Sequence, residues 1–383
     1  MGPTVRVVLR LLNVKCCWSP ILQGLYGPRE LLSIAEGLPG LSERADSTMS
    51  SQKQVVEALG KPEAYDEDPG RIELTQTHIS FVFLTRSFVY KIKKAVDFGF
   101  LDFTTLEKRR FFCEKELELN RRLCGDMYLE VVPINKSNTI KIRGKGETVE
   151  YAVKMKRMPQ KRMLSKLLEQ NRVDSKLVDS IARIVTEFHS KAETNKRIGE
   201  FGSLAMIETN WKENFDQTRE FVDKTLPARD FELIRKRIED FMKRNVPLFE
   251  KRIAEGRVRE CHGDIHSDNI FATDRIYIFD AIEFNERFRY SDVASDVAFL
   301  AMDLDFKKRN DLSSFLVEKY VKYSGDQELT KLLPFYKCYR AYVRGKVTGF
   351  KLEDPNVSNE KKSEAKEEAN AYFKLALNYT NML

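Results

Sequence analysis

The stretch "CHGDIHSDNIFATDRIYIFDAIEF" (residues 261–284) holds the densest cluster of polar side chains in the sequence. Asp264 and Asn269 are five residues apart, and Asp280 follows eleven residues later, at the end of the apolar run "IYIF". A tight loop followed by a hairpin would bring these three side chains together. One carboxylate could then accept the proton of a hydroxyl, while an amide oxygen and a second carboxylate hold magnesium against phosphates. The spacing therefore indicates phosphate-transfer chemistry.

A kinase catalytic loop has the same parts in the same order: His-Arg-Asp, four residues, an asparagine, and a strand that leads to a metal-binding aspartate. The same chemistry needs a lysine on an upstream strand and a glutamate on the helix after it. Lys91 in "FVYKIKK" (88–94) occupies the expected strand position, with Lys93 and Lys94 as weaker candidates. Asp97 begins a literal Asp-Phe-Gly triplet, but it precedes the helix and the catalytic loop, so chain order excludes it as the magnesium ligand.

The helix expected to carry the glutamate lies in "TTLEKRRFFCEKELELNRRL" (104–123), where Thr104 and Glu107 form a predicted capping box. Three glutamates compete as the partner of the lysine: Glu114, Glu116 and Glu118. We expect Glu116, because it shares a helical face with two leucines of the same helix. The preceding loop (95–103) is interpreted as scaffold, with a glycine that allows its bend.

The residue pattern predicts an α+β protein with two lobes, a small antiparallel sheet followed by a larger helical lobe. Alternating apolar and polar residues over 71–96 and 128–159 predict strands, with a tight turn at "LTR" (84–86). After residue 160, helical periodicity dominates, and short strands flank the polar loop. We expect four parts: a poorly ordered extension (1–48), the sheet lobe (49–158), the helical lobe (159–350) and a charged C-terminal helix (351–383).

The composition is that of an ordinary globular chain, with 42% hydrophobic residues, 32% charged residues and a net charge of +7. The positive charge forms no basic block, so no nucleic-acid partner is predicted. No apolar run approaches the roughly 18 residues of a membrane span, and no membrane partner is predicted. The six cysteines form no CxxC pair, which favours free thiols and a cytoplasmic protein. A P-loop motif is absent, which excludes a P-loop nucleotidase.

The first 48 residues differ from the rest, because four basic residues and a single acidic one occur in the first 30. They can be interpreted as a targeting peptide, or as an extension before a domain that begins near Met49. The second interpretation is favoured.

The stretches "HGDIHSDNIF" (262–271) and "IFD" (278–280) resemble the HGDxHxxN and (I/V)D motifs of the aminoglycoside phosphotransferase and choline kinase group, whose fold is protein-kinase-like. The resemblance is closer to the uncharacterised "aminoglycoside phosphotransferase family enzyme" lineage, through "FDAIEFNERFRYSDVASDVAFLAMDL" (279–304), "YRAYVRGKV" (339–347) and the segment from "ELTQTHIS" at residue 73 into the predicted helix. It covers roughly residues 55–350.

The resemblance implies an ATP- and magnesium-dependent phosphotransferase that acts on a hydroxyl of a small molecule. Asp264 would be the catalytic base, and Asn269 and Asp280 would bind magnesium. Lys91 would bind the nucleotide phosphates, with Glu116 as its partner.

Two further residues have implied supporting roles. His262 would brace the catalytic loop, and Asp296 would hydrogen-bond the backbone of that loop. Many members of the lineage also carry a C-terminal P-loop domain, which this sequence lacks. The resemblance therefore suggests a separate P-loop protein as a partner.

The sequence departs from the kinase pattern at two places. A Gly-rich loop is missing, and "TQTHIS" (75–80) takes its position, where backbone amides and the hydroxyls of Thr77 and Ser80 could cover the phosphates. Gly263 replaces the arginine of His-Arg-Asp, which in many protein kinases pairs with a phosphorylated activation loop. This replacement favours a small-molecule kinase.

Three other functions compete with this interpretation. A nucleotide-binding regulatory module without turnover is favoured by the missing Gly-rich loop and opposed by the intact Asp264, Asn269 and Asp280. A protein kinase is disfavoured, because 281–295 is too short for a full activation segment. The string His-x-Asp-x-His at 262–266 could also ligate a metal, as in a hydrolase.

Several side chains have both a functional and a structural interpretation. Arg340 and Arg344 could present a cationic wall to an anionic substrate, or lie on a solvated helix face. Glu283 could assist the metal site or be an exposed turn residue. The remaining ones are expected to be structural: a cap at Asp292, a solvated Asp303, and His78, His189 and Trp211.

Overall fold

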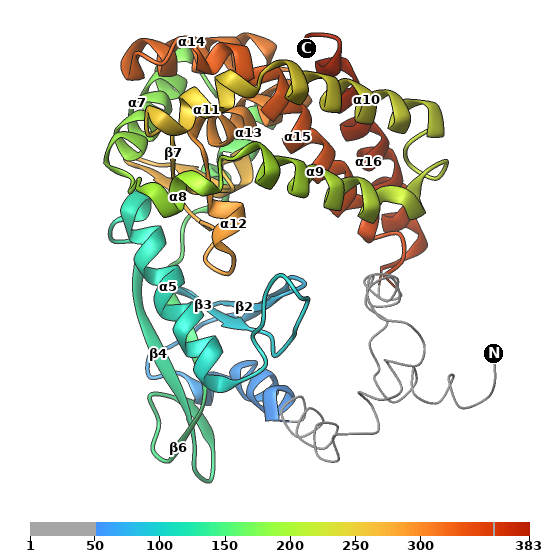
Figure 1. The fold of residues 1–383 in the computed structure, drawn as a ribbon. Coiled ribbons are helices and arrows are strands. Elements are labelled where there is room, and N and C mark those ends of the chain that lie inside the picture. The colour runs from blue at the N-terminus through green and yellow to red at the C-terminus, as the bar shows by residue number, and fades with distance from the viewer. Residues whose placement is uncertain (1–50, 355–356) are drawn as a thin grey trace, which may run out of the picture. The chain divides into compact units, whose positions relative to one another are not determined.

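The computed structural model describes residues 51–354 and 357–383, so the expected extension (1–48) with Cys16 and Cys17 lies outside the described residues. The chain divides into two compact units. The first unit runs to Leu117 and includes Leu129–Arg157, and the second contains Glu118–Tyr128 and Met158–Leu383. A six-stranded sheet dominates the first unit and helices dominate the second, which confirms the predicted α+β class (Figure 1).

The sheet of the first unit has the strand order β1-β2-β3-β6-β4-β5. Antiparallel pairing joins β1 to β2, β2 to β3, β3 to β6 and β4 to β5. Lys91 on β3 lies opposite Val82 on one side and Val153 on the other. The strands are β1 (Glu73–Gln76), β2 (Ser80–Leu84), β3 (Phe88–Lys93), β4 (Tyr128–Lys136), β5 (Ile140–Ile142) and β6 (Glu147–Lys156).

The core of the first unit lies between this sheet and an N-terminal helical segment at 51–59, which is followed by the short helix η1 (Pro62–Ala64). Val55 and Leu59 of that segment pack with Phe83 and Tyr90 of the sheet. Period-two alternation places these sheet residues on the buried face, as the sequence pattern predicts.

Helix α5 (Leu106–Cys124) begins after Thr105, whose Oγ1 accepts a hydrogen bond from the backbone nitrogen of Lys108 at 3.2 Å. Thr104 cannot cap the helix, because its backbone nitrogen and its hydroxyl donate to Asp102 Oδ1 at 3.0 and 2.6 Å. The predicted cap is therefore wrong by one residue.

The loop that contains Asp97 is scaffold, as expected from chain order. Asp97 Oδ1 accepts a hydrogen bond from the backbone nitrogen of Gly99 at 2.8 Å, and Gly99 has a φ of +75°, which suits a residue without a Cβ. Phe103 is fully buried, and the rings of Phe98 and Phe100 stack with their centroids 6.0 Å apart.

The second unit contains helices and four short strands. Its helices are α6 (Leu164–Glu169), α7 (Ser175–Lys191), α8 (Lys196–Glu200), α9 (Leu204–Thr218), α10 (Ala228–Arg244), α11 (Val246–Ala254), α12 (Glu286–Arg289), α13 (Val293–Phe306), α14 (Asn310–Ser324), α15 (Leu329–Phe350) and α16 (Asn359–Thr380). The strands are β7 (Val258–Glu260), β8 (Ile270–Ala272), β9 (Ile276–Ile278) and β10 (Tyr290–Asp292), and the short 3-10 helices are η2 (Gln160–Arg162), η3 (Arg219–Phe221) and η4 (Ser267–Asn269).

The core of the second unit surrounds α13, of which every residue from Val293 to Leu304 is buried. Helix α16 packs against α15, and a Cβ on Gly345 of α15 would lie 3.0 Å from the ring of Phe373 of α16. The missing side chain thus lets the two helices approach closely. The charged C-terminal helix, expected as a separate part, contributes Tyr372 and Phe373 to this core.

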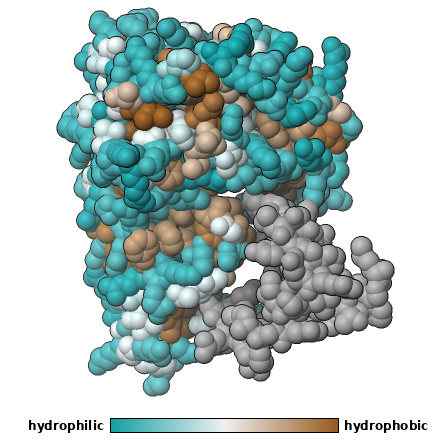
Figure 2. Space-filling view, viewed as in Figure 1, coloured by the Kyte–Doolittle hydropathy of each residue, from teal (hydrophilic) through white to brown (hydrophobic). Residues whose placement is uncertain are grey.

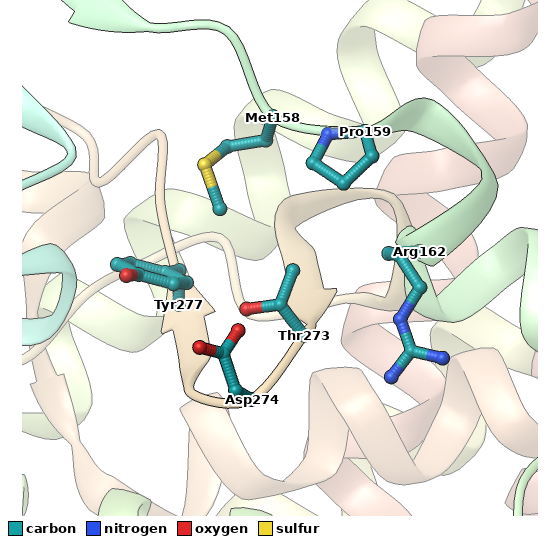
Figure 3. A pocket seen from close by; sticks show the side chains of 6 residues that line it. All are labelled: Met158, Pro159, Arg162, Thr273, Asp274 and Tyr277. Atoms are coloured by element: carbon teal, nitrogen blue, oxygen red, sulfur yellow. The ribbon is translucent and has the colours of Figure 1, made fainter.

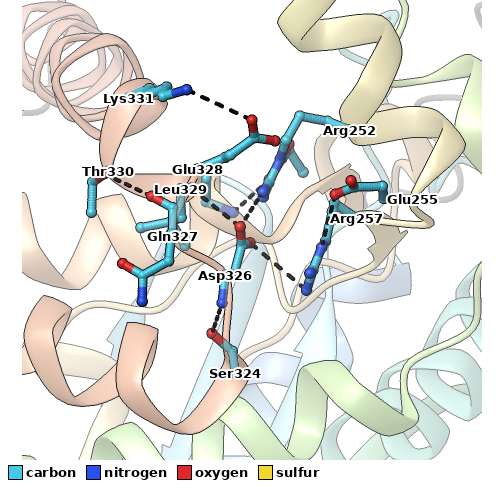
Figure 4. A network of polar contacts seen from close by, with 12 residues as sticks. Arg252, Glu255, Arg257, Ser324, Asp326, Gln327, Glu328, Leu329, Thr330 and Lys331 are labelled. Carbon is cyan, nitrogen blue, oxygen red and sulfur yellow. Dashed lines mark hydrogen bonds and ion pairs between the residues drawn. The ribbon is translucent and has the colours of Figure 1, made fainter.

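A buried ionic network lies at the junction of α11, β10 and the start of α15 (Figure 4). Arg252, which is 1% exposed, donates to both carboxylate oxygens of Asp292 at 2.7 and 2.6 Å and also to Asp326. Asp292 accepts a further hydrogen bond from the backbone nitrogen of Ala294 at 2.8 Å, so it caps α13 as predicted. Asp326 in turn accepts from the backbone nitrogen of Leu329 at the start of α15, at 3.2 Å.

Replacing Arg252 with methionine should destabilise the protein by about 3–5 kcal/mol, because two buried carboxylates would lose their common counter-charge. Urea unfolding measures this change. Arg235→Met is the matched control, because its ion pairs with Glu232 and Glu239 are exposed and should contribute less than about 1 kcal/mol. Equal unfolding midpoints for the two variants would contradict the prediction.

Within the described ranges, no helix is both long and apolar enough to cross a membrane. On the face seen in Figure 2, hydrophilic side chains predominate and hydrophobic ones form separate groups. Four large hydrophobic side chains of the described residues are exposed: Leu74, Phe111, Val347 and Met382. The four cysteines that the structure describes are all free and buried, in agreement with the expected free thiols.

Candidate active site

The polar loop 261–269 of the second unit is held between two small antiparallel ladders. Strand β7, just before the loop, pairs with β10, and β8, just after it, pairs with β9. Ile270 of β8 and Ile278 of β9 lie opposite each other and are fully buried in the core. The apolar residues that flank the loop in sequence therefore anchor both of its ends.

Asp264 and Asn269 are in direct contact. Asn269 Nδ2 donates to Asp264 Oδ2 at 2.9 Å and to the Asp264 carbonyl oxygen at 3.0 Å. His266 Nε2 lies 3.4 Å from the same carboxylate oxygen. Burial opposes the negative charge of Asp264, but the nearby charges of His266 and Arg344 and the hydrogen bond from His266 outweigh it and lower the pKa of Asp264 to about 2. The carboxylate is therefore ionised at neutral pH.

Asp280 follows β9 and is held beside the loop by backbone hydrogen bonds on both of its sides. Before it, the Phe279 nitrogen donates to the Asn269 carbonyl oxygen at 2.9 Å. After it, the Ile282 nitrogen donates to the His262 carbonyl oxygen at 3.1 Å. Asp280 itself has a φ of +65°, which is unusual for a residue other than glycine and is found where a site requires a particular side-chain direction.

Asp296 at the start of α13 holds the loop backbone, as predicted. Its carboxylate accepts hydrogen bonds from the backbone nitrogens of His262 and Gly263 at 2.8 and 2.9 Å. Gly263 has a φ of +88°, and a Cβ there would lie 2.8 Å from the Phe288 carbonyl oxygen. An arginine at position 263 would therefore clash with the backbone, which explains the departure from His-Arg-Asp.

His262 lies inside the loop rather than at its surface. Its Nδ1 accepts a hydrogen bond from the backbone nitrogen of Asp264 at 3.2 Å. Burial lowers the pKa of His262 to about 4, so the ring is neutral at physiological pH. This geometry supports the bracing role that the resemblance implies.

The structure does not gather His262, Asp264 and His266 into a metal site. In the described part of the chain, the only three potential ligands that lie together are His189, Cys261 and Asp296. Both ring nitrogens of His189 already have protein partners, Tyr320 Oη at 2.8 Å and Asp296 at 3.3 Å. We interpret this second cluster as a hydrogen-bonded part of the core, which agrees with the structural role expected for His189.

For neighbouring residues, the structure corrects one expectation and decides between two pairs of open interpretations. Asp303 is 4% exposed rather than solvated, because its Oδ2 accepts a hydrogen bond from the Ser267 nitrogen at 2.8 Å. Glu283 is buried, so it is not an exposed turn residue. Arg340 is not on a solvated face: it donates to the Gly263 carbonyl oxygen at 2.9 Å and lies 4.8 Å from the ring centroid of Phe299.

In the first unit, Glu116 forms ion pairs with two lysines. Lys91 Nζ lies 2.9 Å from Glu116 Oε1, and Lys93 Nζ lies 2.7 Å from Oε2. Burial opposes the charge of Glu116, but the two lysines lower its pKa to about 2. The side chain of Lys91 is 14% exposed and that of Lys93 is 1% exposed. Lys91 is therefore the more solvent-accessible of the two lysines.

If Lys91 has the phosphate-binding role that the resemblance implies, Lys91→Met should lower ATP turnover by about 10²-fold, because the phosphates would lose a cation while Lys93 keeps Glu116 paired. Lys93→Met should instead lower the unfolding temperature, because the buried carboxylate of Glu116 would lose the positive charge of Lys93. ADP release and thermal unfolding of both variants measure these effects. If Lys93→Met lost turnover and Lys91→Met did not, the assignment would be reversed.

The turn at 77–79, which takes the position of a Gly-rich loop, is closed by its own side chains. Thr77 Oγ1 accepts from the nitrogens of Ile79 and Ser80 at 3.3 and 3.0 Å. Ser80 is fully buried, so its hydroxyl is not presented to a ligand here. His78 is exposed rather than structural as expected, whereas Trp211 of the second unit is a core residue.

A cavity of about 650 Å³ lies beside the turn of the β8–β9 hairpin (Figure 3). It is lined by Met158, Pro159, Arg162, Thr273, Asp274 and Tyr277. None of the predicted site residues lines it, so it is a feature separate from the polar loop.

Sequence reasoning missed or underrated three supporting residues. Lys93 was ranked below Lys91, although both lie on one face of β3 two residues apart, which is a readable signal. Arg340 and Asn120 contact the loops from distant segments: Asn120 Oδ1 accepts from the Ala281 nitrogen at 2.9 Å, next to Asp280. No local pattern could have identified these two contacts.

Comparison with known proteins gives a family match and several relatives. Residues 139–333 match the model of the phosphotransferase enzyme family, APH. The chain is 33% identical over 277 residues to an uncharacterized protein of Mycobacterium tuberculosis (strain ATCC 25618 / H37Rv). The aligned residues make up 72% of this chain and 54% of that protein. The chain thus spans about half the length of the curated relatives it matches.

Solved structures show more distant similarity to this chain. A choline/ethanolamine kinase family protein from Mesorhizobium loti has a TM-score of 0.47 and 14% identity, over 88% of this chain and 100% of that chain. An aminoglycoside phosphotransferase from Streptomyces rimosus has a TM-score of 0.39 and 15% identity, over 86% of this chain and 97% of that chain.

Proposed function

Because the chain belongs to the phosphotransferase enzyme family, we propose that it is an ATP- and magnesium-dependent kinase that transfers the γ-phosphate to a hydroxyl of a small molecule. Asp264 is proposed as the catalytic base, Asn269 and Asp280 as magnesium ligands, and Lys91 as the lysine that contacts the phosphates. The cytoplasmic location expected from the cysteines and the separate P-loop protein suggested by the resemblance stay predictions.

The observation that carries this proposal is the pair of backbone hydrogen bonds on either side of Asp280. They hold Asp280 beside the loop in which Asn269 donates to Asp264. An amide that donates through Nδ2 keeps its Oδ1 as an acceptor, so an amide oxygen and a carboxylate are available together as hard ligands that suit magnesium. When bound, Mg·ATP would supply the phosphate and the charge neutralisation, while Asp264 accepts the hydroxyl proton.

The segment after Asp280 supports a small molecule as the acceptor rather than a protein. Helix α12 and strand β10 occupy residues 286–292, and β10 pairs with β7. Arg289 is buried and donates to Glu260 Oε1 at 3.1 Å and to the Ile282 carbonyl oxygen at 2.8 Å. A segment so short and so fully bonded leaves no independent activation loop to dock a protein substrate.

The direct test is a screen of hydroxylated metabolites with ATP labelled at the γ-phosphate. We expect transfer of label to at least one metabolite, dependent on magnesium and on Asp264. A protein that binds Mg·ATP but transfers no label to any acceptor or to water would support the alternative of a regulatory module. Failure to bind Mg·ATP would contradict the proposal as a whole.

A further inference from the structure

Arg344 lies one helical turn after Arg340 on α15, toward the catalytic loop. Arg340 contacts the carbonyl oxygen of Gly263, the residue just before Asp264, at 2.9 Å. Residues four apart lie on the same face of a helix, so Arg344 extends the surface that meets this loop. In agreement, the charge of Arg344 is among those that lower the pKa of Asp264, after His266 and against the effect of burial.

The guanidinium of Arg344 is held by an aromatic ring. Its Cζ lies 5.5 Å from the ring centroid of Tyr372 on α16. Tyr372 is 2% exposed, and its ring stacks on Phe306 with centroids 3.8 Å apart and an interplanar angle of 8°. The close approach of α15 and α16 at Gly345 holds this aromatic support in place. Because Tyr372 occupies only one side of the guanidinium, the remaining N–H groups of its planar fork can serve an oxyanion.

Arg344 differs from the other arginines of this unit that lie near the loop. Arg289 and Arg340 are within ion-pair distance of Glu260 and Asp296. Among the described residues, no carboxylate lies within 4.0 Å of the Arg344 guanidinium, which is partly exposed. The nearby Asp303 is buried and accepts from the Ser267 nitrogen, so it already has a partner.

We propose that Arg344 binds an oxyanion of the acceptor, so that the substrate is a small hydroxylated carboxylate or phosphate ester. The inference rests on the proposed function, because it places the acceptor hydroxyl at Asp264. Arg344 would hold the oxyanion by its planar fork of donors and offset its repulsion from the ionised Asp264. An ammonium group in the same position of the acceptor would be repelled by the positive charge of the guanidinium. The site therefore disfavours amino alcohols and amino sugars.

A matched set of sugars tests the proposal with the full-length chain: glucose, glucosamine, gluconate and glucose 6-phosphate, at constant ionic strength with Mg·ADP present. Calorimetry should find that gluconate or glucose 6-phosphate binds at least about tenfold more tightly than glucose or glucosamine. Preference for gluconate would identify a carboxylate as the oxyanion, and preference for glucose 6-phosphate would identify a phosphate.

Arg344→Gln should remove this preference and leave the affinity for Mg·ATP unchanged, and Arg344→Lys should restore only part of it, because lysine keeps the charge without the fork. Arg183→Gln is the matched control, since Arg183 on α7 also lies over a tyrosine ring, 4.2 Å from the centroid of Tyr323. Thermal unfolding establishes that each variant is folded.

The proposal is overturned if wild-type protein shows no preference for the anionic sugars, if it prefers glucosamine, or if Arg344→Gln keeps the preference. Arg344→Gln could keep the preference for anionic sugars while the acid limb of its pH–rate profile moves to higher pH. That result would show that Arg344 only helps to keep Asp264 ionised, and it would overturn the proposal. Binding of Mg·ATP is measured on the same samples. Its loss would contradict the proposed function, whereas intact binding without a preference for anions would contradict this inference alone.

Discussion

Asp264→Asn is expected to lower ATP-dependent phosphate transfer by about 10²–10⁴-fold, because the amide cannot accept the proton of the acceptor hydroxyl. Asparagine has almost the same shape as aspartate, and its carbonyl oxygen can still accept the hydrogen bond that Asn269 Nδ2 donates at 2.9 Å. The loop should therefore keep its structure, and the affinity for Mg·ATP should change by less than about threefold. ADP release measures the first effect, and calorimetry with Mg·ATP measures the second.

Asp274→Asn is the matched control for this variant. Asp274 lies in the turn of the β8–β9 hairpin, is exposed, and has none of the hydrogen bonds that hold the catalytic loop. The same change of charge there should leave ADP release and Mg·ATP affinity at wild-type values. Wild-type turnover in Asp264→Asn would rule out Asp264 as the base, and equal losses in both variants would indicate a general effect of charge.

The second large effect is expected for Asp280→Ala, which should weaken magnesium-dependent nucleotide binding by at least about tenfold. Without the carboxylate that would hold magnesium, the protein would bind the ion, and with it the nucleotide, less tightly. Calorimetry with ATP, in the presence of magnesium and with the ion removed by EDTA, separates the two contributions. The wild type without magnesium and Asp280→Ala with magnesium should then give similar affinities.

Asp280→Gly separates the role of the carboxylate from its backbone conformation. The φ of +65° at this position is unfavourable for aspartate and accessible to glycine. The glycine variant should therefore be more stable than Asp280→Ala by about 1 kcal/mol, yet bind Mg·ATP equally poorly. If the glycine variant kept magnesium-dependent binding, Asp280 would not be a metal ligand.

The contacts between predicted site residues that agree with the sequence are those set by local spacing. Asp264, Asn269 and Asp280 lie within one loop and one hairpin, so the residues between them limit how far apart they can be. The kinase pattern likewise placed Lys91 on a strand, and helical periodicity favoured Glu116 over its two neighbours. The ion pair between Lys91 and Glu116 agrees with this choice.

Predictions failed or stayed open where a polar partner, near or far along the chain, decides the outcome. Asp303 was expected in solvent and is buried beneath the backbone nitrogen of Ser267, and Arg340 was open to two interpretations and contacts the carbonyl oxygen of Gly263. The cap of α5 moved by one residue because Asp102 engages Thr104. In each of these cases a polar group found a partner that the local hydrophobic pattern does not specify.

The sequence by itself determined the chemical groups and their order: a strand lysine, a helix glutamate, then aspartate, asparagine and aspartate around one loop. The order of these residues and the short spacing between them can be read from the sequence without knowing how the chain packs. Only the tertiary structure decided which of several similar charges are engaged and which face the site. Arg340 and Arg344 are alike in sequence. Packing buries Arg340 against the catalytic loop and places Arg344 beside the ring of Tyr372, with no carboxylate within 4.0 Å among the described residues. That difference depends on contacts made by α13 and α16, since the energy of a charge is set by the groups that surround it in space.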